Sequence, residues 1–251
     1  AKVAAADFKK QGLDIKLGAK VGKATAGKKG VEVEYEDSDG AQKLTVEKLV
    51  VAVGRRPVTK DLFAEDAGIQ LDERGFIVVD DECRTRVKGV YAIGDCVRGP
   101  MLAHKGSEEG VMVADLIVGE IAEMNYDVIP SVLYTSPEIA WAGKTEAEVK
   151  TSGRAYKTGQ FPFMASGRAK AMEQTTGFVK IISSKDDDEV LGVHIVGPMA
   201  GELIAEAVLA LEFAASTEDI QRTIHAHPSL AEAVHEAALA VDGKALNFPN
   251  R

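Results

Sequence analysis

The pattern of apolar and polar positions divides the chain into short strands and amphipathic helices. The helical periodicity of residues 3–11 ends at Gly12. The composition of residues 37–40, Asp-Ser-Asp-Gly, is typical of a hairpin turn. The apolar run 48–53, which ends at Gly54, predicts a buried strand. Earlier strands are predicted at residues 13–17, 20–25, 31–35 and 43–46.

The next region has one short predicted strand and one long helix. The strand spans residues 89–93 and leads into Gly94 and Asp95, and the helix spans about 104–122. An acid between a strand end and a helix entrance can bind a hydroxyl group, while the helix dipole favours negative charge. Asp95 is equally consistent with a simple turn residue after Gly94, and the local sequence leaves both readings open.

From residue 129 onward, strands come first and helices follow. This order predicts an antiparallel sheet with helices packed on one face, an α+β unit. Together with the earlier segments, it gives a fold class of α/β plus α+β. Strands are expected at residues 131–134, 139–143, 155–163, 177–183 and 190–196, and helices from Thr145 and over 201–214, 217–224 and 229–242.

Composition narrows the possible partners. The net charge of −9 and the pI near 5.2 argue against nucleic acid and against anionic membrane surfaces. No apolar run approaches the roughly 20 residues of a membrane span. The cysteines, Cys83 and Cys96, have neither metal-site nor disulfide-framework spacing, which favours a cytoplasmic location.

The segment 225–232, His-Ala-His-Pro-Ser-Leu-Ala-Glu, carries the strongest candidate chemistry. Ser229 and Glu232 have the spacing of a capping box, which places His227 and Pro228 at a helix entrance. A histidine oriented by an acid can act as a base near neutral pH. A purely structural histidine, or a His-x-His metal pair that lacks a third nearby ligand, also fits the residues.

Further motifs occur in a consistent order along nearly the whole chain. With His-Ala-His-Pro they resemble the flavoprotein disulfide reductases, and the doubled histidine favours the dihydrolipoamide dehydrogenase branch over glutathione reductase. The motifs are Val-Ala-Val-Gly-Arg-Arg-Pro at 51–57, Tyr-Ala-Ile-Gly-Asp at 91–95, Met-Leu-Ala-His-Lys at 101–105, Tyr-Thr-Ser-Pro-Glu at 134–138, Phe-Pro-Phe at 161–163, Arg-Ala-Lys-Ala at 168–171, Gly-Pro at 197–198 and Glu-Leu-Ile at 202–204.

The resemblance implies FAD and NAD as cofactors. It implies that Asp95 binds the ribityl or phosphate side of FAD and that Gly54 lies at the border of the NAD-binding domain, where close backbone approach is useful. The backbone at the entrance of the 104–122 helix would face the flavin pyrimidine oxygen, which implicates Met101, Leu102, Ala103 and His104.

For the last region, the resemblance implies that His227 takes a thiol proton from dihydrolipoamide and that Glu232 bonds the other ring nitrogen. In this family the histidine serves the active site of the partner subunit. The implied assembly is a homodimer through residues 129–251, and the implied substrate is the lipoyl-bearing component of 2-oxo-acid dehydrogenase complexes.

The resemblance also sets the expected domains and their gaps. We expect the end of an NAD-binding domain at 1–54, part of an FAD-binding domain at 55–128 and an interface domain at 129–251. Because Gly-x-Gly-x-x-Gly and the family's redox cysteine pair are absent from the sequence, we expect an inactive C-terminal part of a longer enzyme. The alternatives are a flavin-free dimerisation module or another reductase of the family, such as glutathione reductase.

Overall fold

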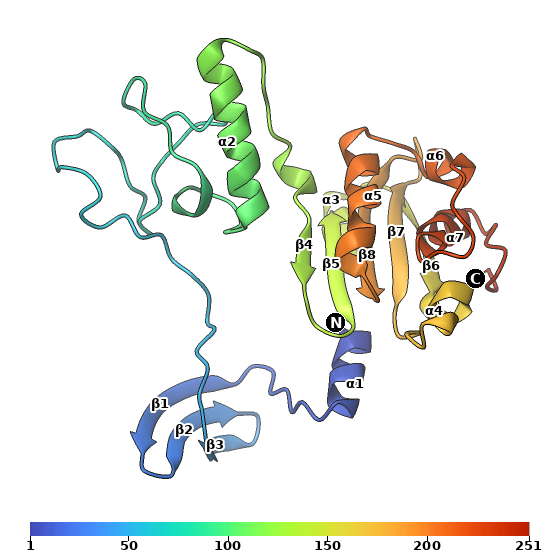
Figure 1. The fold of residues 1–251 in the computed structure, drawn as a ribbon, viewed down its shortest axis with the longest axis horizontal. Helices are drawn as coiled ribbons and strands as arrows, with labels where there is room; N and C mark the ends of the chain where they lie inside the picture. The colour runs from blue at the N-terminus through green and yellow to red at the C-terminus, as the bar shows by residue number, and fades with distance from the viewer. Residues whose placement is uncertain (251) are drawn as a thin grey trace. The chain divides into compact units, whose positions relative to one another are not determined.

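The computed structural model describes residues 1–250, which form two compact units. Residues 9–122 form one unit, and residues 1–8 together with the chain from 123 onward form the other. Figure 1 labels their helices and strands. The first helix, α1 (Lys2–Lys10), confirms the predicted N-terminal helix and spans the point at which the chain passes from one unit to the other.

A three-stranded antiparallel sheet opens the 9–122 unit (Figure 1). Its strands, in the order β1-β2-β3, confirm three sequence predictions, and Asp37 pairs with Gly40 across the predicted hairpin turn. Gly40 has a φ of +96°, a conformation that favours glycine in such turns. The bounds are β1 (Lys20–Gly27), β2 (Gly30–Asp37) and β3 (Gly40–Val46).

Other strand predictions for this unit were wrong. In the described chain, residues 13–17 and 48–53 form no strand, and the side chains of Val50, Val51 and Val53 are 84%, 72% and 91% exposed. A buried strand needs hydrogen-bonded neighbours, and no described segment pairs with this run. At 89–93, Tyr91 makes only an isolated bridge to Arg84.

The helical part of this unit is a 3₁₀ turn followed by one long helix. The turn η1 (Gly94–Cys96) follows directly after the predicted strand at residues 89–93, and α2 (Ala103–Val118) confirms the predicted helix. α2 is shorter than expected because Gly119, with a φ of +91°, takes a left-handed C-cap. A small core of Ile77, Ala92 and Val97 lies beside the turn.

The other unit is a five-stranded antiparallel sheet covered by helices, which confirms the α+β prediction (Figure 1). The strand order is β4-β5-β8-β7-β6. The strands are β4 (Ser131–Leu133), β5 (Glu138–Gly143), β6 (Tyr156–Pro162), β7 (Phe178–Ser184) and β8 (Val190–Gly197), with short turns η2 (Tyr126–Val128) and η3 (Phe163–Ala165).

Alternation along the central strands explains the packing. Val179 and Ile181 of β7 join the main core beneath the C-terminal helices, whereas Ile182, the next residue, packs with Val149 in a separate cluster. Gly159 of β6 allows close packing, because a Cβ there would lie 2.1 Å from the Ala237 carbonyl oxygen. The helices are α3 (Glu146–Ser152), α4 (Gly167–Ala171), α5 (Ala200–Glu212), α6 (Thr217–Arg222) and α7 (Glu232–Val241).

An ion pair ties the end of α7 to the sheet. Lys157 Nζ lies 2.8 Å from Asp242 Oδ1, and Gln221 Nε2 donates to Asp242 Oδ2 at 3.1 Å. These donors outweigh partial burial and lower the pKa of Asp242 to about 2. Since the unfolded value is about 4, the charged carboxylate stabilises the fold above about pH 4, and the effect is lost as the pH falls toward 2.

Replacing Asp242→Asn should therefore lower the free energy of unfolding by about 1–2 kcal/mol near neutral pH. The difference from the unsubstituted chain should shrink to near zero as the pH falls to about 2. Urea denaturation over a series of pH values measures it. Asp186→Asn, at an exposed turn residue, is the control. A difference independent of pH would contradict the assignment.

Candidate functional site

The predicted base and its acid lie together where α7 begins. Glu232 is the first residue of α7, and its Oε1 is 2.8 Å from His227 Nδ1. Its Oε2 accepts a hydrogen bond from the Ser229 N–H at 2.8 Å, and the Glu232 N–H donates to Ser229 Oγ at 3.4 Å. The reciprocal bonds of the capping box are present, but the prediction of a helix from Ser229 was wrong, because α7 begins three residues later.

The environment of Glu232 favours its carboxylate form. Partial burial raises its pKa, but the Ser229 N–H and the His227 ring outweigh this, and the net pKa lies below the usual value. A carboxylate at Nδ1 favours the tautomer with a proton on Nδ1 and a lone pair on Nε2. Because the His227 side chain is 79% exposed, Nε2 can accept a proton from an approaching group.

A second cluster, in the 9–122 unit, joins two of the predicted cofactor-binding residues. Arg55 forms an ion pair with Asp95, and its Nη1 donates to the Met101 carbonyl oxygen at 3.4 Å. Sequence reasoning missed Arg55, although it lies within the Gly-Arg-Arg-Pro motif. Gly54 needs glycine for its φ of +106°, whereas an added Cβ would meet no described atom within 4 Å, so the expected close approach is not seen in this chain.

The entrance of α2 suits a negatively charged or electron-rich group. Its N-cap is Leu102, whose hydrocarbon side chain offers no acceptor to the first-turn N–H groups of Ala103 and its neighbours. His104 is exposed in the same turn. Gly94 and Gly106 pack closely, since a Cβ on Gly106 would lie 3.0 Å from Gly94 Cα. Close packing of these glycines places Asp95 beside the helix entrance.

A fully buried ion pair holds this turn to the helix. Lys105 Nζ lies 3.0 Å from Glu109 Oε1, with both side chains inaccessible to solvent. The same Nζ donates to the carbonyl oxygens of Gly94 at 3.1 Å and Arg98 at 2.9 Å. Glu109 Oε2 accepts from the Gly94 N–H at 2.7 Å. Both backbone groups of Gly94 are thus bound by the pair, which fixes the residue before Asp95.

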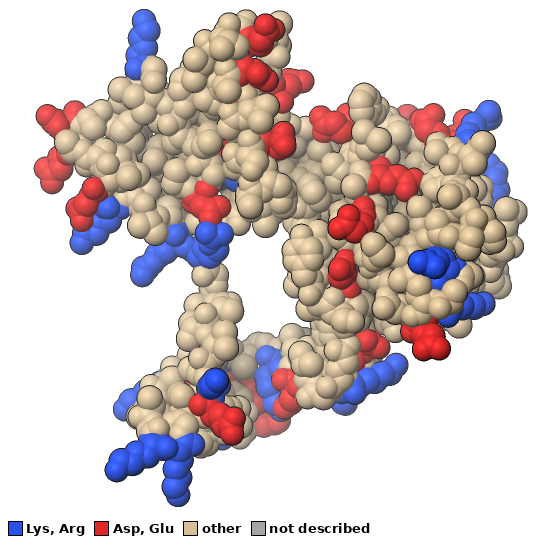
Figure 2. Space-filling view, viewed as in Figure 1, with Lys and Arg blue, Asp and Glu red and all other residues tan. Residues whose placement is uncertain are grey.

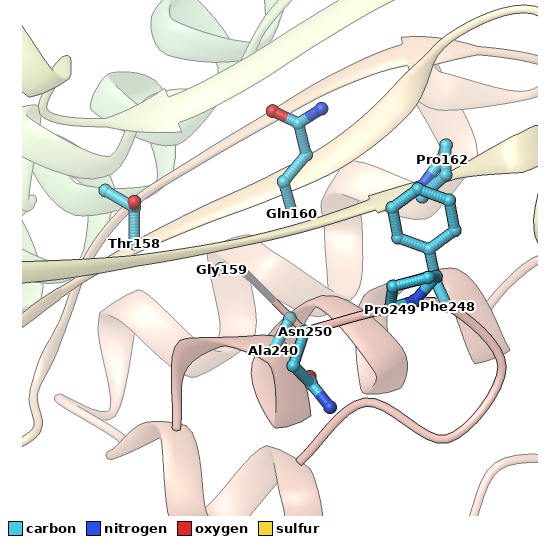
Figure 3. A pocket seen from close by; sticks show the side chains of 8 residues that line it. All are labelled: Thr158, Gly159, Gln160, Pro162, Ala240, Phe248, Pro249 and Asn250. Carbon is cyan, nitrogen blue, oxygen red and sulfur yellow. The ribbon is translucent and has the colours of Figure 1, made fainter. Parts of the chain in front are cut away.

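A cavity elsewhere does not contain these residues. It measures about 320 Å³ and lies between β6 and the C-terminal segment (Figure 3). Its lining has no titratable side chain, so it offers no acid–base group: Thr158, Gly159, Gln160, Pro162, Ala240, Phe248, Pro249 and Asn250. Among residues 1–250, no three His, Cys, Asp or Glu side chains are grouped to hold a metal ion.

The surface and the helices add two observations. Acidic and basic side chains are interspersed over much of the visible surface, and acidic atoms gather near α5 (Figure 2), which carries Glu202, Glu206 and Glu212 and no basic residue.

Within the described residues, no helix is long and apolar enough to cross a membrane.

Comparison with known proteins identifies the family. Residues 129–238 match the dimerisation domain of the pyridine nucleotide-disulphide oxidoreductases. Residues 1–110 match a separate model, which is described as pyridine nucleotide-disulphide oxidoreductase. The chain belongs to the pyridine nucleotide-disulphide oxidoreductase family.

Named relatives of the chain include dihydrolipoyl dehydrogenases. The chain is 55% identical to a dihydrolipoyl dehydrogenase of Cupriavidus necator over 99% of its length, and 49% identical to the human mitochondrial dihydrolipoyl dehydrogenase over 96%. It covers 52% and 48% of those proteins, so it spans about half the length of these relatives. Among solved structures, LpdA of Mycobacterium tuberculosis is similar with a TM-score of 0.88 and 29% identity, covering 95% of this chain and 51% of LpdA.

The flavoprotein disulfide reductase RclA of Escherichia coli is also similar, with a TM-score of 0.85 and 27% identity over 94% of this chain and 54% of RclA. These likenesses show the oxidoreductase fold and the family, and they confirm the family predicted from the sequence motifs.

The buried ion pair of Lys105 and Glu109 gives a test of how Gly94 is held. Lys105→Met should lower the free energy of unfolding by about 3 kcal/mol or more, because it leaves the Glu109 carboxylate buried without its cation. Combining it with Glu109→Gln should recover part of the loss. Chemical denaturation measures both, with Glu108→Gln, an exposed position on the same helix, as the control. If the double variant were less stable than Lys105→Met alone, the two charges would not compensate each other, and this assignment would be contradicted.

Proposed function

We propose that the chain is the C-terminal half of a dihydrolipoyl dehydrogenase that oxidises protein-bound dihydrolipoamide and reduces NAD+ through FAD. Its parts would be the end of an NAD-binding domain at 1–54, a partial FAD-binding domain at 55–128 and an interface domain at 129–251. The observation that carries the proposal is the contact between His227 and Glu232 at 2.8 Å, within a chain that belongs to the disulphide oxidoreductase family.

The proposed chemistry of this half is proton transfer. A thiolate, rather than a thiol, is the nucleophile in disulfide exchange, so a base is needed near neutral pH. His227 would accept the thiol proton at Nε2, and the resulting imidazolium would be stabilised by the Glu232 carboxylate at Nδ1. Exposure of His227 suits a substrate that arrives on another protein. The redox cysteine pair of the family would have to come from outside this chain.

The second cluster fits part of an FAD site. The carboxylate of Asp95 can accept hydrogen bonds from hydroxyl groups, and the α2 entrance with Leu102 as N-cap favours negative charge on a ring oxygen. FAD, when bound, supplies two-electron transfer between thiols and NAD. Met101, Ala103 and His104 would contribute backbone at this entrance, and Gly54 would lie at the NAD-domain border.

The proposed assembly is a homodimer through residues 129–251, in which His227 serves the partner's active site. It is supported by the match of 129–238 to a dimerisation domain. The proposed substrate is the lipoyl-bearing component of a 2-oxo-acid dehydrogenase complex. We place the enzyme in the cytoplasm, as for a bacterial protein, although the human relative is named mitochondrial.

The base assignment predicts the kinetics of the full-length enzyme. His227→Gln should reduce turnover of dihydrolipoamide by roughly two to four orders of magnitude, the usual contribution of a positioned base. Glu232→Ala should cost less, because the imidazole remains but loses its orientation. Steady-state assays measure both, with His194→Gln on β8 as the matched control. Activity of His227→Gln within about threefold of the parent would exclude this role.

Flavin retention separates the proposed enzyme half from a flavin-free dimerisation module. Native mass spectrometry and absorbance of the purified chain should show FAD bound when a complementary half is present. The Asp95→Ala variant should retain less FAD, because a hydroxyl acceptor is removed. A colourless dimer that never binds FAD in the presence of that half would instead favour the module.

A further inference from the structure

The first histidine of His-Ala-His-Pro, His225, is buried and has its own hydrogen-bond partners. The His225 side chain is only 6% exposed. Its Nδ1 lies 2.9 Å from the Thr223 carbonyl oxygen, and its Nε2 lies 2.6 Å from Glu206 Oε1. Since a carbonyl oxygen only accepts, Nδ1 must carry a proton. Both ring nitrogens are therefore engaged, unlike those of exposed His227.

The Nε2 contact requires one more proton. If Nε2 and Glu206 were both unprotonated, two lone pairs would face each other at 2.6 Å in a buried position. Either Nε2 donates to the Glu206 carboxylate, or a protonated Glu206 donates to Nε2. In both cases the pair shares one proton in addition to the proton on Nδ1.

The neighbouring histidine favours this assignment. The His235 ring stacks on His225 with ring centroids 4.9 Å apart and planes 26° apart. Its Nε2 faces the Gln221 carbonyl oxygen at 2.9 Å, so that nitrogen is the donor and the ring satisfies this contact while neutral. Two stacked cations would repel, whereas one cation beside a neutral ring does not carry that cost.

The contacts of the His225 side chain come from three helices, and they lie just before His227 in the sequence. Glu206 comes from α5, Thr223 follows α6, and His235 belongs to α7, which all lie in one unit (Figure 1). Burial, the Ser229 N–H and His227 act first on Glu232, and the charge of His225 also contributes to its lowered pKa. The buried pair is thus electrostatically linked to the exposed one.

We propose that His225 and Glu206, sharing one proton, form a positioning pair that anchors the His-Ala-His-Pro segment and fixes His227 against Glu232. This inference rests on the proposed role of His227. The groups that face His225 are Glu206 from α5, His235 from α7 and the Thr223 carbonyl.

Nitrogen-15 NMR of the histidine rings tests the anchor in this chain. At neutral pH, His225 should show two protonated ring nitrogens. Alternatively, it should show one protonated nitrogen while the carbon-13 shift of the Glu206 carboxyl group shows that Glu206 is protonated. In Glu206→Gln, His225 should become a neutral ring with the proton on Nδ1, because the Gln amide can donate to Nε2. Glu212→Gln, on the same helix but exposed, should leave the spectrum unchanged. A singly protonated His225 beside an ionised Glu206 overturns the proposal.

Kinetics of the full-length enzyme test the positioning role. Glu206→Ala should lower kcat by about ten- to a hundredfold with little change in KM, because the base is misplaced. Glu206→Gln should retain most of kcat, because its amide can still donate a hydrogen bond to His225 Nε2. Equal losses of kcat in both variants would contradict the positioning role and reduce the pair to a purely structural contact.

The two proposals fail in different ways. If His227→Gln keeps its activity, the proposed function fails, yet the NMR result for His225 still decides whether the anchor exists. If His227→Gln loses activity and Glu206→Ala does not, the function stands and the positioning role of Glu206 is refuted.

Discussion

The position of the first residue of α7 is the constraint on which the candidate site depends. Glu232 can bond His227 only if the helix that carries it is fixed on the sheet. Packing provides this: Ala233, Ala237 and Val241 are buried in the main core, and Gly159 lets the β6 backbone approach the helix. The acid is therefore placed by apolar contacts, and it orients a histidine that is itself exposed.

The two histidines of one short motif illustrate how surroundings set the role of a residue type. Each has a glutamate as partner, at 2.6 Å for His225 and 2.8 Å for His227. His225 is buried with both nitrogens bound, which suits holding a structure together. His227 is exposed with only Nδ1 bound among the described residues, which suits exchanging a proton with a ligand.

Sequence reasoning succeeded where local pattern and tertiary environment agree. The β7 and β8 strands have apolar residues on both faces, since Val179 and Ile181 join the main core while Ile182 packs with Val149. Their predicted bounds, read from the apolar pattern, lie within one residue of those in the structure. It failed for residues 48–53, where an equally apolar run has no described strand beside it. Strand formation depends on a distant partner segment, which the pattern within one run does not reveal.

The site residues divide in the same way. His227 and Glu232 could be predicted because a capping-box spacing is local, even though α7 begins later than expected. Arg55 and Glu206 were missed because their partners, Asp95 and His225, lie 40 and 19 positions away. Lys105 and Glu109 had a visible signal, since four-residue spacing on a helix brings opposite charges together. That spacing usually marks an exposed pair, and only the structure shows the burial.

The buried pair of Lys105 and Glu109 controls the position of the turn that carries Asp95. The core beside the turn is small, with Ile77, Ala92 and Val97 as its buried members, so apolar packing supplies little positional control there. Charged groups supply it instead, because Lys105 and Glu109 bind both backbone groups of Gly94 with directional bonds. A buried ion pair adds little net stability compared with apolar side chains, but its geometry is demanding. Directional hydrogen bonds beside this small core thus fix the position of Asp95. In the same way, apolar packing of α7 fixes the position of Glu232.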